Sequence, residues 1–218
     1  MFSVEEQTGN RNRPIQKQAN TQVEHGLSDS SEFETSQHWM ASLQGIYGEA
    51  VIRYEHGARG ADDVIPESGL AFLASIGTTA QEIYDFVEDW SEVGEPPFST
   101  VAAITAVRRE YFLTVQHGQP STQTISPSTL PSGSAELGGY RWLPRIIAKA
   151  RAKLRGEMPP ELMYGCGADR PFLRTVGIDP SAFLRIVWQT ENDDQVILAI
   201  VRFYSRTFPH GKKFIRGT

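Results

Sequence analysis

One stretch, residues 138–188, combines a strongly amphipathic basic segment with a series of helix-start and helix-stop signals. Within residues 140–154, apolar side chains recur at the spacing of one helical face, and basic side chains occupy the opposite face. Pro144 suits the first turn of a helix, and Gly156 predicts its end. Asp179 followed by Pro180 predicts another helix start. The stretch therefore predicts several short helices rather than strands.

The residues before this stretch show the same kind of pattern. Ser36 and Ser99 are predicted N-caps, and Thr79 with Glu82 forms the Thr-x-x-Glu pattern of a capping box. We expect a loop over residues 58–67 and a last helix that starts at residue 193 or 194. The predicted upstream helices are 36–54, 68–76, one that begins at residue 79 and ends before Gly94, and 99–116. The predicted fold class is therefore all-α.

Composition predicts four parts in the chain. Residues 1–31 carry few large apolar side chains, so they cannot bury enough surface to offset the entropy of ordering and are predicted to be disordered. Residues 118–137 are rich in Ser, Thr and Pro, which predicts a flexible linker. This linker would join a first helical unit, residues 32–117, to a second, residues 138–218.

The two predicted units share a sequence pattern. FLASIG at residues 72–77 matches FLRTVG at residues 172–177, an offset of 100 residues. Thr79 and Asp179 follow at equivalent positions as predicted helix starts. Because core positions, helix stops and helix starts agree together, we interpret the units as an internal duplication.

Charge divides unevenly between these parts. Residues 1–137 contain 7 Lys/Arg and 19 Asp/Glu, a net charge of −12, whereas residues 138–218 contain 14 and 7, a net charge of +7. The two halves can attract each other, or the basic half can face an anionic small molecule or a protein partner. The acidic half would oppose a nucleic acid, which disfavours that partner.

The compartment is also constrained by the sequence. No apolar run approaches the length of a membrane span, and the N-terminus lacks the apolar region of a secretory signal. A single cysteine cannot form a disulfide within the chain, which suits a reducing cytoplasm. We therefore expect a cytoplasmic protein with no membrane partner.

The second unit resembles a bacterial family called domain of unknown function 5069. GGYRWLPRIIAKARAKLRGE and YGCGADRPFLRTVGID carry the resemblance. Ala148 stands where such family members have an aspartate, so an acid or base role at that position is absent. The resemblance implies a fold and no mechanism, and the first unit is only a remote copy. The matching positions are Gly138, Gly139, Tyr140, Leu143, Pro144, Arg145, Lys149, Ala150, Arg151, Cys166, Asp169, Phe172, Leu173, Gly177 and Ile178.

Cys166 is the first candidate for chemistry. It lies between two glycines just before a predicted helix start, where a ligand can approach closely and a helix N-terminus with a nearby arginine activates a thiol. The alternative is a small buried residue in a tight loop. His210 is the only histidine of the second unit and the only possible partner for a Cys-His pair there.

Basic residues supply the other candidates. Arg145, Lys149 and Arg151 can form an anion pocket with Arg170 or Arg174, or they can form a solvated helix face. Asp169 is predicted to cap a helix or pair with an arginine, and Tyr140 to be a core aromatic with a polar tip that can contact a ligand. We expect no metal site and no cofactor, because no ligand spacing or nucleotide-binding motif is present.

Three functions remain open. The first is a non-catalytic role in binding or assembly, which the repeat and the charge division favour. The second is a small-molecule enzyme or anion binder that uses Cys166 with Arg145, Lys149 and Arg151. The third is nucleic-acid binding by the basic helix.

Overall fold

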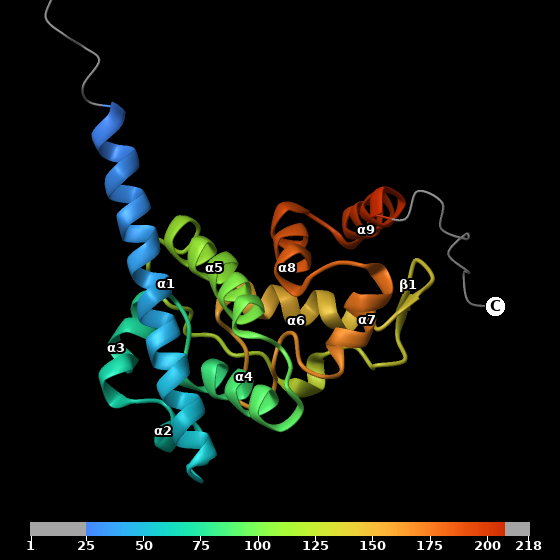
Figure 1. The fold of residues 1–218 in the computed structure, drawn as a ribbon. Helices are drawn as coiled ribbons and strands as arrows, with labels where there is room; N and C mark the ends of the chain where they lie inside the picture. Colours follow the sequence, from blue (N-terminus) through green and yellow to red (C-terminus); the bar gives the residue numbers. More distant parts are fainter. Residues whose placement is uncertain (1–24, 208–218) are drawn as a thin grey trace, which may run out of the picture. The chain divides into compact units, whose positions relative to one another are not determined.

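The computed structural model describes the backbone of residues 25–207 and the side chains of residues 38–203. This part of the chain is mostly helical, with one two-stranded hairpin as its β structure (Figure 1). The prediction of a helical fold is confirmed at this level. Contacts divide the chain into residues 1–39 and residues 40–218. The predicted tail up to residue 24, His210 and the basic residues near the C-terminus lie outside the described residues.

The first helix, α1 (His25–Glu55), is longer than predicted. Ser36 lies inside it, so the predicted N-cap is wrong, and residues 25–31 of the predicted disordered tail have helical backbone. No proline interrupts residues 25–55, so the helical hydrogen bonds continue upstream of Ser36. Its apolar residues Leu43, Tyr47, Ala50 and Tyr54 recur at helical spacing, and all four are buried.

Four helices follow α1 in the first half. Thr79 begins α4 with both hydrogen bonds of the predicted capping box. The predicted cap at Ser99 is wrong, because α5 already begins after the extended backbone of Pro97. Residues 58–67 are not entirely a loop, since they include one helical turn that is too short to show a periodic pattern. These elements are α2 (Ala61–Val64), α3 (Glu67–Ser75), α4 (Ala80–Val93) and α5 (Phe98–Thr114).

The second half opens with a hairpin instead of a helix. Tyr140 lies in the second strand, so the predicted helix start at Tyr140 is wrong. Gly138 and Gly139 have φ of 60° and 86°, and two-residue hairpin turns favour such positive values. The elements are β1 (Glu136–Leu137), β2 (Tyr140–Arg141), α6 (Leu143–Arg155), α7 (Asp169–Val176), α8 (Pro180–Gln189) and α9 (Asp193–Thr207), with a short 3-10 turn at Pro127–Thr129 before them.

The pairs α3–α4 and α7–α8 share a local geometry at the predicted offset. The Thr78 amide donates to the Leu73 carbonyl at 3.1 Å, and the Ile178 amide donates to the Leu173 carbonyl at 3.0 Å. The glycine before each donor has φ of 71° and 69°, respectively. The likeness covers these two turns, and the internal duplication stays a prediction.

Helices from both predicted units form one compact body within residues 40–218. Its centre is α5, α6 and α8, which pack on one another (Figure 1). The segment predicted to be a flexible linker runs along this body. Its Ile125 amide donates to the Glu157 carbonyl at 3.0 Å, and its Pro131 carbonyl accepts from Arg145 at 2.8 Å.

Ion pairs join the acidic half to the basic half. Lys153 lies 2.8 Å from Glu82, and Arg185 lies 2.7 Å from Glu110. The expected attraction between the halves therefore takes place inside one body. No helix among the described residues is long and apolar enough to cross a membrane.

Candidate functional site

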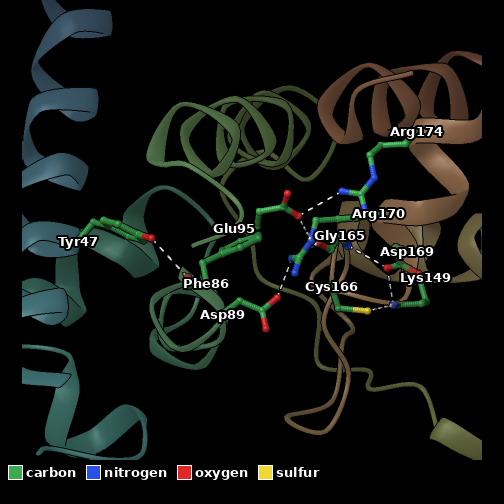
Figure 2. Close-up of polar contacts among 10 residues, drawn as sticks. All are labelled: Tyr47, Phe86, Asp89, Glu95, Lys149, Gly165, Cys166, Asp169, Arg170 and Arg174. Carbon is green, nitrogen blue, oxygen red and sulfur yellow. Dashed lines mark hydrogen bonds and ion pairs between the residues drawn. The ribbon is translucent and has the colours of Figure 1, made fainter. Parts of the chain in front are cut away.

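Three of the predicted site residues meet in one cluster. The Lys149 Nζ lies 2.5 Å from Asp169 Oδ2 and 3.3 Å from Cys166 Sγ (Figure 2). Trp142 Nε1 donates to Asp169 Oδ1 at 2.9 Å, and the Gly165 amide donates to Oδ2 at 2.9 Å. We call these five residues the Lys149 cluster. Its carboxylate accepts three hydrogen bonds, as a buried carboxylate requires.

Exposure differs sharply within the cluster. Asp169 is fully buried and Lys149 is 3% exposed, whereas Cys166 is half-buried. Cys166 lies in a tight loop, as the alternative interpretation expected, but it is only partly buried. Lys149 projects inward from α6, and the loop before α7 folds back over it, with Gly165 at φ 80°. The cluster thus keeps its ion pair inside, while the cysteine is only partly covered.

The buried carboxylate also affects a neighbouring phenol. Tyr164 is buried and donates its hydroxyl to the Pro180 carbonyl at 2.7 Å. Burial, together with the charge of Asp169, holds the pKa of Tyr164 well above its usual value. This hydroxyl therefore anchors the loop to the start of α8 as a neutral donor.

Asp169 does not act as predicted. It is the first residue of α7 and its partner is a lysine, so both expected roles, helix cap and arginine partner, are wrong. The reason is tertiary, because the loop turns the carboxylate toward α6 rather than toward its own helix start.

Three other predicted residues lie apart from the cluster's ion pair. Arg145 donates to the Pro131 carbonyl and stacks over the Trp142 ring at 5.7 Å from its centroid. Arg151 pairs with Asp193 at 2.6 Å. Tyr140 lines a cavity of about 500 Å³ beside the hairpin. That these residues bind a ligand stays a prediction.

The basic face of α6 is largely neutralised. Lys149 is 3% exposed, so the interpretation as a solvated face is wrong for it, and Lys153 is also buried, at 2% exposed. Both lie inside because α6 packs against α5 on one side and α8 on another. This pairing leaves little positive charge for the phosphates of a nucleic acid. The pairs are Lys149–Asp169, Arg151–Asp193, Lys153–Glu82 and Arg155–Glu157.

The Lys153–Glu82 pair lies beside a second carboxylate with an unusual pKa. Burial raises the pKa of Glu82, but the charge and hydrogen bond of Lys153, with help from Thr78 and the Thr79 amide, hold it below its usual value. Burial raises the pKa of Asp85 from 3.8 to about 6, against the hydrogen bond from Gln81.

Asp85→Asn is expected to stabilise the protein at high pH. The folded-state pKa is raised, so the contribution of Asp85 to stability is full below about pH 4 and is lost as pH rises through about 6. The difference in free energy of unfolding between the variant and wild type should rise by about 1 kcal/mol from pH 5 to pH 8, after allowance for solvent screening. Urea unfolding at both pH values measures this, with exposed Asp62→Asn as the control. An equal difference between the variant and wild type at both pH values would contradict this prediction.

A groove of about 410 Å³ contains two arginines of α7. Glu95 Oε2 lies 3.3 Å from Arg170 Nε and 3.2 Å from Arg174 (Figure 2). Arg170 also pairs with Asp89 at 2.7 Å and donates to the Gly165 carbonyl at 3.2 Å. We call this the arginine groove. Its lining residues are Glu95, Pro96, Pro97, Thr100, Arg170, Leu173, Arg174, Gly177, Ile178, Asp179 and Pro180.

The acidic side of this groove was not predicted from the sequence. Glu95 lies 79 residues before Arg174, and Asp89 lies 81 residues before Arg170. No local pattern links residues at such distances in the chain. Among the described residues, no group of three or more His, Cys, Asp or Glu side chains is arranged to hold a metal ion.

Comparisons with known proteins bear on the C-terminal region alone. A search of curated proteins and a search of solved structures gave no match. Residues 128–213 match the family model described as Domain of unknown function (DUF5069). This match confirms the resemblance that the glycine, tyrosine, cysteine and aspartate positions predicted, and it includes the Lys149 cluster together with both arginines of the groove. The C-terminal region of the chain is therefore similar to the DUF5069 family, whose description assigns it no activity.

Proposed function

We propose that this protein is a non-catalytic binding protein that takes a small carboxylate-bearing molecule in the arginine groove. One observation carries the proposal, since a carboxylate, that of Glu95, already lies against both Arg170 and Arg174 at the groove. Arginine suits this task because its planar guanidinium matches the geometry of a carboxylate. Glu95 thus marks the place where a ligand carboxylate would lie.

Glu95 can be displaced at little cost. Its side chain is 51% exposed and that of Arg174 is 61% exposed. Exposed ion pairs contribute about 0–1 kcal/mol, so a ligand can replace Glu95 without a large loss of stability. Arg170, only 10% exposed, would stay in place because Asp89 and the Gly165 carbonyl hold it. The groove thus combines one buried, well-held arginine with one exposed arginine.

The walls of the groove indicate the class of ligand. Pro96, Leu173 and Ile178 supply apolar surface, and the volume of about 410 Å³ is in the range of small-molecule sites. Asp179 lines the same groove and would repel a second negative charge. We therefore expect a monocarboxylate with an apolar body, and we expect inorganic phosphate to bind less well.

Two substitutions should move the affinity in opposite directions. Glu95→Gln removes the internal competitor and should strengthen binding of benzoate by about two- to fivefold. Arg174→Gln removes one of the two guanidinium groups and should weaken binding by about tenfold. Isothermal titration calorimetry with benzoate, hexanoate and inorganic phosphate measures both effects.

Arg185→Gln is the matched control for these variants. Arg185 is an exposed arginine paired with a glutamate, Glu110, and it does not line the groove. Its loss should leave benzoate affinity unchanged. The proposal fails if neither carboxylate binds the wild-type chain or Glu95→Gln, or if Arg185→Gln weakens binding as much as Arg174→Gln does.

A further inference from the structure

We propose that Cys166 and Lys149 form a peroxide-responsive modification site, at which hydrogen peroxide joins Sγ to Nζ through a covalent bond. The two atoms lie 3.3 Å apart, and the lysine nitrogen lies between the sulfur and the carboxylate of Asp169 (Figure 2). This inference does not depend on the binding of a ligand in the arginine groove.

The reaction requires a sulfur that an oxidant can reach and a nitrogen that is held beside that sulfur. Cys166 is half-buried rather than fully buried, and the proposal takes a small oxidant to reach its sulfur from solvent. Lys149 is 3% exposed and its ion pair with Asp169 holds the nitrogen beside the sulfur. Gly165 and Gly167 flank the cysteine, and such residues allow the loop to adjust as the bond shortens.

The absence of a second cysteine makes the lysine the available partner. An oxidised thiol usually condenses with another thiol, but Cys166 is the only cysteine of the chain. A sulfenic acid can also condense with a nitrogen to give a sulfenamide. In the Lys149 cluster, the nitrogen in hydrogen-bond contact with Sγ is that of Lys149.

The reaction balances in two steps. In the first, the Cys166 sulfur attacks peroxide, an S–O bond forms, the O–O bond breaks, and one water leaves. The sulfur is oxidised by two electrons and the peroxide is reduced. In the second, Nζ gives a proton to Asp169 Oδ2 and attacks the sulfur. An S–N bond forms, the S–O bond breaks, and the departing hydroxide takes a second proton from the nitrogen to leave as water.

Asp169 makes the second step possible inside the protein. Before the reaction, an ammonium and a carboxylate form a buried pair with no net charge. Afterwards, the neutral S–N link lies beside a protonated carboxyl, so no uncompensated charge remains buried. A dithiol reductant attacks the sulfur and restores the thiol and the amine.

Mass spectrometry of the wild-type chain tests the inference directly. After treatment with hydrogen peroxide, the intact protein should be lighter than the reduced protein by two hydrogen atoms. A tryptic map should contain a linked pair of peptides that carries Lys149 and Cys166, without cleavage after Lys149. Dithiothreitol should abolish the linked pair. A wild-type product that carries only added oxygen on Cys166 would overturn the inference.

Lys149→Arg removes the nucleophile and keeps the positive charge, and Lys153→Arg on the same helix is the control. With Lys149→Arg, trapping of the sulfenic acid by dimedone should rise about fivefold over wild type, whereas Lys153→Arg should match wild type. Equal trapping in all three proteins would contradict the inference. Because Lys149→Arg can disturb folding, the tryptic map of the wild-type chain decides the question without a variant.

Discussion

Replacement of Asp169 with alanine is expected to lower the free energy of unfolding by about 3–5 kcal/mol. The variant leaves the Lys149 ammonium buried without its carboxylate. It also removes the acceptor of the Trp142 indole and the Gly165 amide. Urea unfolding monitored by circular dichroism measures the change, which is the largest we expect from a single side chain.

A double variant separates the ion pair from its surroundings. Lys149→Met with Asp169→Leu replaces both charges by apolar groups of similar size, and this kind of exchange often costs little. It should therefore recover most of the stability that Asp169→Ala loses. A double variant as unstable as the single one would show that the hydrogen bonds from Trp142 and Gly165 dominate instead.

Gly77→Ala is expected to cost about 3 kcal/mol. Gly77 has φ of 71°, and a Cβ there would lie 2.4 Å from the ring of Phe112. A non-glycine residue in left-handed backbone costs about 1–2 kcal/mol, and overpacking adds about 1–3 kcal/mol. The turn between α3 and α4 packs directly on α5 at this point, so relief requires a backbone shift.

Gly94→Ala provides the matched comparison for Gly77→Ala. Gly94 also ends a helix, with φ of 72°, but nothing lies within 4 Å of its added Cβ. It should cost about 1–2 kcal/mol from backbone strain alone. The difference between the two variants in urea unfolding then measures the contact with Phe112. No difference would show that the Phe112 ring moves aside freely.

Local signals predicted the helices most successfully where they acted within one turn. Thr79 with Glu82 predicted the start of α4 because both hydrogen bonds of a capping box connect residues three apart. The same logic failed for Ser36, since a polar residue in mid-helix resembles a cap when only neighbours are considered. Gly138 and Gly139 fit a helix start or a hairpin turn, and pairing of β1 with β2 decided between them.

For the candidate site residues too, some features were indicated by the sequence and others required the tertiary structure. The sequence indicated that Lys149, Cys166 and Asp169 are chemically notable, and the structure brings them together. The sequence could not indicate that Arg145 and Arg151 lie apart from the Lys149–Asp169 ion pair, because all the arginines and lysines of α6 look alike in a helical pattern. Burial of Lys149 and Lys153 depends on α5 and α8, which belong to distant segments.

By itself, the sequence determined a mostly helical chain with an acidic and a basic half and one cysteine beside a helix start. Those properties depend on composition and on hydrogen bonds between near neighbours. Only the tertiary structure decided that Asp169 lies against Lys149 and that Glu95 reaches the arginines of α7. Such contacts join residues far apart in the chain, and their partners depend on how the helices pack.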